Sequence, residues 1–207
     1  TMQSMPVCGN QMGCCFRDLA LREHAKANQT GIYNEAINSF LRNVDIRVVG
    51  DSDSISKGKI CSLNASAVLT DMEQRVVNEI LQGPLRDVFD SKQFITDISG
   101  SRNNWAVGHQ VFGSLYEEQI LEKLRKLAEP CDCLQCFFII YSTGGGTGSG
   151  LGTFLLKVLE GEFPELYRFM TSIYPSEEDD VITLPYNSIS AMKGLNEHAD
   201  CVVPTNN

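Results

Sequence analysis

The chain has 207 residues, of which 43% are hydrophobic and 21% are charged, and its formal net charge is -9. This length and composition are typical of a globular protein with about one to one and a half domains. The acidic balance offers no electrostatic footprint for a nucleic-acid backbone or an anionic membrane surface, so we expect neither partner. No apolar run approaches the roughly twenty residues that a membrane span needs.

Cysteine usage bears on the compartment and on metal binding. The chain contains eight cysteines, but its N-terminus lacks the basic segment and apolar core of a secretory signal. We therefore expect a soluble intracellular protein with reduced thiols. Cys133 and Cys136 form one Cys-x-x-Cys pair, yet no second pair or nearby histidine completes the four ligands of a structural zinc site. The three histidines show no triad spacing with a nucleophile, which argues against Ser-His-Asp hydrolases.

The first half of the chain predicts short strands that alternate with helices. A capping box, Thr70 with Glu73, is expected to start one of these helices. The expected elements are a weak strand within 1–8, a helix from residue 9, a helix over 33–41, a loose hairpin around 50–54, a strand over 66–69, a helix around 76–81 and a strand over 94–98.

The second half continues the same alternation. Its expected elements are a helix over 112–127, a strand over 136–141, a helix from 151 to 161, a strand over 167–174, a helix near 186–196 and a strand from 201. Helices of about ten to twenty residues between strands favour βαβ units. The sequence thus predicts an α/β fold, with a doubly wound, mostly parallel sheet and helices on both faces.

A glycine-rich segment between the strand at 136–141 and the next helix predicts a phosphate-binding turn. Five of its seven residues, Gly144–Gly150, are glycine, so backbone N–H groups can close around an anion. A flexible linker would have polar, aperiodic flanks, whereas this segment joins an apolar strand to an apolar helix face. Its spacing matches neither the P-loop nor the dinucleotide fingerprint. In doubly wound sheets such a loop faces the crevice beyond the carboxyl ends of the strands.

Four motifs carry a resemblance to a known family: Asn103–His109, Cys131–Gln135, Gly144–Gly150 and Pro185–Asn187. In this order they resemble tubulins, and the glycine segment is shared more loosely with the FtsZ division proteins. The segments 43–62 and 81–89 are most similar to the epsilon branch, which is associated with centrioles. The resemblance implies one tubulin/FtsZ-type GTP-binding domain over residues 1–207, with the C-terminal part of the family fold absent.

By position, the resemblance implies contacts to GTP or GDP with Mg²⁺. On the first helix, Cys8, Gln11 and Met12 would line the nucleotide. Asp180 would face the ribose and Asn207 would read guanine. Asp71 and Glu73 would lie on the phosphate and magnesium side, with Glu73 as the metal contact. The phosphates would be held by Ser142 and by the glycine segment: Gly144, Gly145, Gly146, Thr147 and Gly148.

Plainer roles exist for some of these residues: Asp71 and Glu73 could simply cap a helix, and Asn207 could be a frayed end. The chain also departs from the family pattern. Pro6-Val7 replaces a Gly-Gln pair, and Leu184 replaces a glutamate that contacts ribose. Arg102 replaces a glycine, where it would either crowd the site or pair with the γ-phosphate.

The resemblance implies an epsilon-tubulin-like cytoskeletal protein of the cytoplasm, with a structural role at centrioles, the centrosome or microtubules. Its partners would be other tubulin subunits or centriolar proteins. The family's water-activating acid lies beyond residue 207, so hydrolysis by this chain alone is not expected. In tubulins a core helix follows residue 207, and its loss would leave parts of the sheet and of 151–159 uncovered. The alternatives are a nucleotide-free interaction module or truncated isoform with a degraded site, and a dinucleotide-dependent oxidoreductase.

Overall fold

A computed structural model of the chain describes residues 2–4, 8–29, 35–44, 60, 62–98, 100–176, 179 and 181–206. Six strands form one sheet in which every neighbouring pair is parallel. In spatial order they are β5 (Phe94–Thr96), β4 (Ala67–Asp71), β1 (Met2–Ser4), β6 (Cys136–Ser142), β7 (Tyr167–Tyr174) and β8 (Cys201–Asn206).

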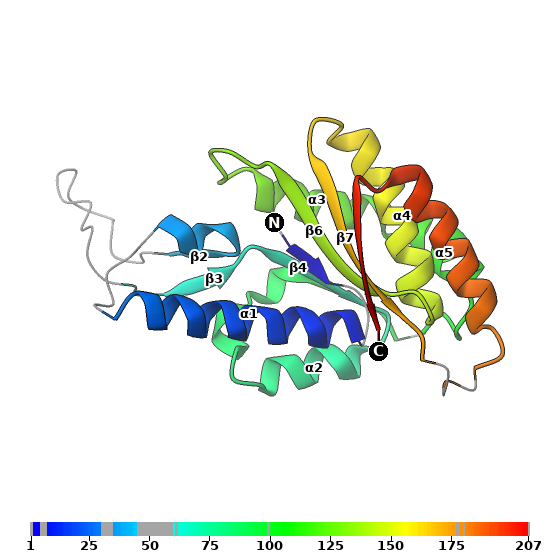
Figure 1. The fold of residues 1–207 in the computed structure, drawn as a ribbon, viewed down its shortest axis with the longest axis horizontal. Helices are drawn as coiled ribbons and strands as arrows, with labels where there is room; N and C mark the ends of the chain where they lie inside the picture. Colours follow the sequence, from blue (N-terminus) through cyan, green and yellow to red (C-terminus); the bar gives the residue numbers. More distant parts are fainter. Residues whose placement is uncertain are drawn as a thin grey trace.

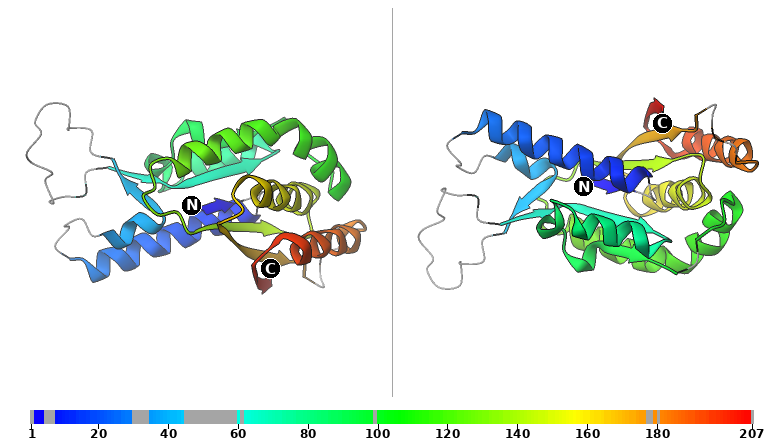
Figure 2. Two further views of the ribbon diagram at one scale, coloured as in Figure 1. Left: turned by 90° about the horizontal axis from the view of Figure 1, so that it is seen from above. Right: turned by 90° about the horizontal axis from the view of Figure 1, so that it is seen from below.

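Helices cover both faces of this sheet, which confirms the predicted α/β class (Figure 1). Figure 2 shows α1 and α3 on opposite sides of the strands. The long helices are α1 (Cys8–Ala27), α2 (Gln74–Gln82), α3 (Gly113–Ala128), α4 (Gly146–Glu162) and α5 (Leu184–His198). Shorter ones are η1 (Glu35–Ser39), η2 (Arg86–Val88), η3 (Ser91–Gln93) and the π-helical turn η4 (Val107–Phe112).

β1 lies at the centre of the sheet and pairs with β4 on one side and with β6 on the other. The strands that follow β1 are added first on the β4 side, and from β6 onward on the opposite side. The chain therefore leaves two neighbouring strands toward helices on opposite faces: β1 leads to α1, and β6 leads to α4. Ligands of doubly wound sheets bind at such a switch point, outside the carboxyl ends of the strands. The fold thus brings the beginnings of α1 and α4 to one crevice.

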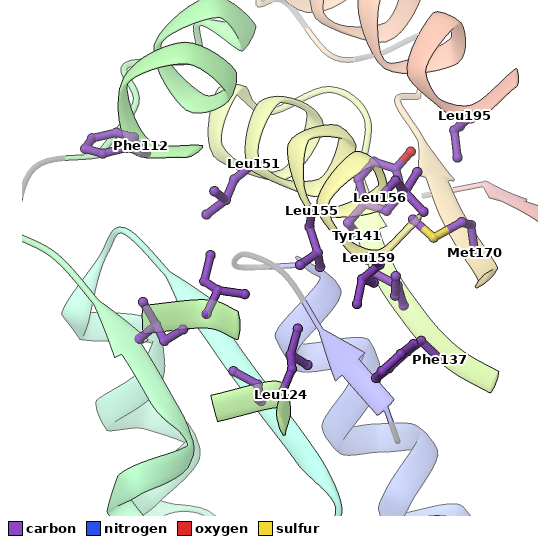
Figure 3. Packing of buried hydrophobic residues seen from close by; sticks show 14 of the residues in the cluster. Phe112, Leu124, Phe137, Tyr141, Leu151, Leu155, Leu156, Leu159, Met170 and Leu195 are labelled. Atoms are coloured by element: carbon purple, nitrogen blue, oxygen red, sulfur yellow. The ribbon is translucent and has the colours of Figure 1, made fainter. Parts of the chain in front are cut away.

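One apolar core lies between the sheet and the helices α3, α4 and α5 (Figure 3). Leu151, Leu155 and Leu159 recur on one face of α4 and are at most 1% exposed, as the 3.6-residue period requires. Phe137 and Tyr141 come from alternate positions of β6 and meet this face. The expectation that 151–159 would be uncovered is therefore wrong, because the chain itself buries this helix.

A second core lies on the other face, under α1 and α2, and includes a small two-stranded antiparallel ribbon. The ribbon consists of β2 (Leu41–Asn43) and β3 (Leu63–Ala65). The predicted helix over 33–41 is wrong at its end, because Leu41 pairs with Ala65 across the ribbon instead of continuing η1. Most of the expected hairpin loop lies outside the described residues.

Two helix starts also differ from prediction. The helix predicted from residue 151 begins at Gly146, so only Gly144 and Gly145 of the glycine segment precede it. The capping box is absent, since Thr70 lies within β4 and Glu73 makes no side-chain cap at the start of α2. No helix in the described part of the chain is long and apolar enough to cross a membrane.

On the α1 side of the sheet, no helix of the described residues covers β7 and β8. In Figure 1, β7 and β8 run across the near face without a helix in front of them. On this face Phe169 is 38% exposed and Val203 is 47% exposed, whereas their strand neighbours Met170 and Val202 face the opposite core. We call the side chains of Phe169 and Val203 the uncovered strip. Contiguous exposed apolar surface marks a place where a protein associates with something.

Arg17 of α1 is fully buried, which is unusual for a cationic side chain. Its Nη1 donates to the carbonyl of Gly13 at 3.2 Å, and its guanidinium lies 5.4 Å from the ring centroid of Phe89. Nε and Nη2 have no hydrogen-bond partner among the described residues. Burial lowers the pKa of Arg17 to about 10. The desolvation of this charge is thus only partly offset.

We predict that Arg17→Met stabilises the chain, because methionine keeps the apolar stem and removes two buried donors without partners. The free energy of unfolding should rise by about 1–3 kcal/mol, measured by urea denaturation. Arg22→Met, on the exposed side of the same helix, is the matched control and should change it by less than about 0.5 kcal/mol. Loss of stability in Arg17→Met would show that the guanidinium has a compensating partner.

Candidate functional site

A cavity of about 290 Å³ lies where the carboxyl ends of the strands meet the beginnings of α1 and α4. Its size approaches the lower end of the range for small-molecule sites. It brings together eight of the residues predicted from sequence: Cys8, Asp71, Glu73, Ser142, Gly145, Gly146, Thr147 and Gly148. Three further residues complete its lining: Ser101, Arg102 and Asn103.

The first turn of α4 faces this cavity with its backbone. Gly145 precedes the helix in extended conformation and offers no side-chain cap. The first N–H to bond within the helix is that of Ser149, which donates to the Gly145 carbonyl at 3.1 Å. The preceding N–H groups point out of the helix start, where the helix dipole favours an anion. Gly146, Thr147 and Gly148 thus form an anion-binding turn.

The two glycines at the turn differ in what surrounds them. A Cβ on Gly145 would meet no atom within 4 Å, although Gly145 lines the cavity. A Cβ on Gly146 would lie closer than 3.0 Å to the backbone at Asn103 and Asn104. Gly146 is therefore required for close packing against a neighbouring loop. Gly145 keeps the space of the cavity open.

That neighbouring loop follows β5 and forms one wall of the cavity. Ser101 Oγ lies 2.8 Å from Thr147 Oγ1, so the loop and the first turn of α4 share a hydrogen bond. Arg102 and Asn103 both have positive φ, 52° and 53°. Left-handed backbone is uncommon for residues other than glycine, so this loop holds strain beside the cavity.

Asn187 of α5 ties both walls together, although the sequence indicated it only as part of a motif. Its side chain is 2% exposed. Nδ2 donates to the carbonyls of Asn103 and Gly144, each at 2.9 Å. Oδ1 accepts from the backbone N–H of Trp105 at 2.9 Å. The relative position of the two loops is thus fixed by one buried amide.

The acidic side of the cavity is built from the end of β4. Asp71 is 1% exposed, and its carboxylate accepts from Asn10 Nδ2 at 3.3 Å and from the Glu73 N–H at 3.0 Å. Asn10 also donates to the Thr70 carbonyl at 3.2 Å, which links α1 to β4. Asp71 and Glu73 place carboxylate oxygens beside the anion-binding turn, and Mg²⁺ binds through one or two carboxylates together with phosphates. This donor set fits Mg²⁺.

Three predicted contacts lie on α1. Cys8 lines the cavity, and burial raises the pKa of its thiol, so it faces the cavity uncharged. Gln11 and Met12 follow one turn later on the same side of the helix, and both are exposed. They do not line this cavity. Gln11 instead lines a separate apolar groove between α1 and α2, together with Cys14.

A smaller cavity of about 160 Å³ continues the crevice toward β7. Gly144, the remaining described residue of the predicted set, lines this cavity, as do Tyr174 and Leu184. The two cavities share Asn103, Ser142 and Gly145. Asp180 and Asn207 lie outside the described residues, so their predicted contacts stay predictions.

Comparison with known proteins bears on this site. The family model for the GTPase domain of the Tubulin/FtsZ family matches residues 7–207. The chain is 82% identical to the tubulin epsilon chain of Homo sapiens and 79% identical to that of Mus musculus, over 97% of this chain. This chain is also 37% identical to the tubulin beta-6 chain of Gossypium hirsutum, and the match covers 96% of this chain. It spans 42% of the length of the two epsilon chains.

The expected resemblance to tubulins, and to their epsilon branch in particular, is thereby confirmed. The match covers both walls of the cavity and the helix start between them, which supports a nucleotide-binding role of the tubulin type. The chain belongs to the Tubulin/FtsZ family and falls within its GTPase domain.

Proposed function

We propose that this chain binds GTP and GDP at the crevice, as the nucleotide-binding domain of an epsilon-tubulin-like cytoskeletal protein. The observation that carries the proposal is the uncapped start of α4, whose backbone N–H groups face a cavity of ligand size. A phosphate group supplies what these donors lack, namely acceptors and negative charge. Ser142 and Thr147 add hydroxyl groups at the same place.

The arrangement of the loops suggests how the nucleotide would be oriented in the crevice. With its phosphates on the turn after β6, the ligand would meet Asp71 and Glu73 on one side and the loop after β7 on the other. Mg²⁺ would bind near Glu73. Asp180 would take the ribose and Asn207 the guanine base, with α1 along the nucleotide: Cys8, Gln11 and Met12.

The role of the whole protein is part of the proposal. The relatives are tubulin chains more than twice as long as this one. By analogy, this chain would serve a structural role in the cytoskeleton of the cytoplasm, at microtubules, centrioles or the centrosome. Its partners would be other tubulin subunits or centriolar proteins. Residues 1–207 would form one domain, and further chain of the family fold would cover the uncovered strip.

We predict that guanine nucleotides bind at least about tenfold more tightly than adenine nucleotides. Competition between a fluorescent GDP analogue and unlabelled GTP or ATP, with Mg²⁺ present, measures the ratio. Equal displacement by ATP and GTP would contradict guanine recognition. No binding of either would instead favour the nucleotide-free interaction module.

The assignment of the turn is tested by a pair of matched variants. Gly145→Val should weaken GTP and GDP binding at least about tenfold, because its side chain would occupy cavity space without a clash in the fold. Gly161→Val in the last turn of α4 meets equally open space far from the cavity and should bind normally. Equal affinity in the two variants would remove the turn from the site.

We predict no appreciable GTP turnover by this chain alone, because the family resemblance puts the water-activating acid outside residues 1–207. A phosphate-release assay at rising chain concentration should stay at the level of a buffer control. Steady release that scales with the chain and disappears in Gly145→Val would refute this prediction.

We predict that the uncovered strip binds a hydrophobic dye, and that extending the chain with the residues that follow in the human epsilon chain raises the melting temperature and suppresses this dye binding. The reason is burial of Phe169 and Val203. Phe169→Thr in the original chain is the control and should lower dye binding alone. A longer chain with the same melting temperature and dye signal would show that other residues cover this face.

A further inference from the structure

Arg102 is the one basic side chain among the described residues that line the larger cavity, and the acidic ones are Asp71 and Glu73. Arg102 is exposed and forms no ion pair with another described residue. Glu73 lines the same cavity, but its carboxylate forms no ion pair with Arg102. Among the described residues, a cation without an ion-pair partner therefore borders a cavity whose helix start favours an anion.

The backbone conformation of Arg102 lowers the stability of the folded chain. Its φ of 52° is in the left-handed region, which disfavours every side chain relative to glycine. The strain persists because Ser101 bonds to Thr147 and because Asn187 holds the carbonyl of Asn103. Strained residues of this kind cluster at ligand-binding loops, where the surrounding contacts impose them.

The sheet order indicates which part of a nucleotide Arg102 would meet. Arg102 follows β5 at one end of the sheet, the anion-binding turn follows β6, and the smaller cavity lies at β7. A nucleotide whose phosphates cross the turn and whose ribose lies toward β7 extends its terminal phosphate toward β5. The planar guanidinium is suited to phosphate oxygens, which it binds in bidentate fashion.

We infer that Arg102 pairs with the terminal phosphate of a bound nucleoside triphosphate and thereby sets the preference of the site for triphosphate over diphosphate. This inference rests on the proposed nucleotide binding at the same cavity. A second consequence follows from the strained backbone at Arg102. Arg102→Gly should stabilise the free protein and at the same time weaken triphosphate binding.

The test compares three variants of the 207-residue chain. Arg102→Gln removes the charge and keeps the strained backbone. Arg102→Gly removes both. Lys26→Gln removes one positive charge at the far end of α1, about 27 Å from Cys8 along the helix axis. Titration calorimetry with a non-hydrolysable GTP analogue and with GDP, both with Mg²⁺, gives the affinity ratio, and thermal melts without nucleotide give the stability.

Both Arg102 variants should bind the GTP analogue about tenfold more weakly and GDP less than about threefold more weakly. Arg102→Gly should melt about 2–4 °C higher than the original chain, whereas Arg102→Gln and Lys26→Gln should not. If the original chain binds neither nucleotide, the proposed function and this inference fail together. If it binds both but the ratio is unchanged in Arg102→Gln, or changes only in Arg102→Gly, the inference alone is overturned.

Discussion

The close packing of two backbones governs both the fold and the site of this chain. A Cβ on Gly108, Gly146 or Gly150 would lie closer than 3.0 Å to a backbone atom of the opposing segment, so the helix start and the segment 103–109 touch without side chains between them. Such an approach is open only to glycine. It sets the distance between the anion-binding turn and the loop of Arg102, and the Asn187 amide then fixes their orientation.

Anion binding in a chain of net charge -9 depends on local rather than overall charge. The start of α4 contributes its N–H groups and the positive end of its dipole, which falls off within the first turn. The negative charge of Asp71 weakens the positive potential at this helix start. Its carboxylate is stabilised by hydrogen bonds from Asn10 and from a backbone N–H. The crevice therefore combines a fixed anion-binding surface with carboxylates that suit a hard cation, the charge pattern that a phosphate chain with Mg²⁺ requires.

The sequence revealed elements with strong local periodicity and missed contacts that join distant residues. The strand at 167–174 was predicted to the residue, because its apolar pattern is bounded by clear turn signals. The start of α4 was missed, since glycine costs about 1 kcal/mol per residue in a helix interior, and only its packing against a segment forty residues away makes the helix begin there. The partners of Asn10 and Asn187 could not be predicted either, because they are 61 and 82 residues away along the chain.

The uncovered strip and the crevice are two separate places at which another group could bind the folded chain. Phe169 and Val203 carry the first, and the anion-binding turn lines the second. Any group that binds only the folded chain stabilises it by mass action. A segment that covers the uncovered strip and a nucleotide that fills the crevice should therefore each raise the stability of the folded chain.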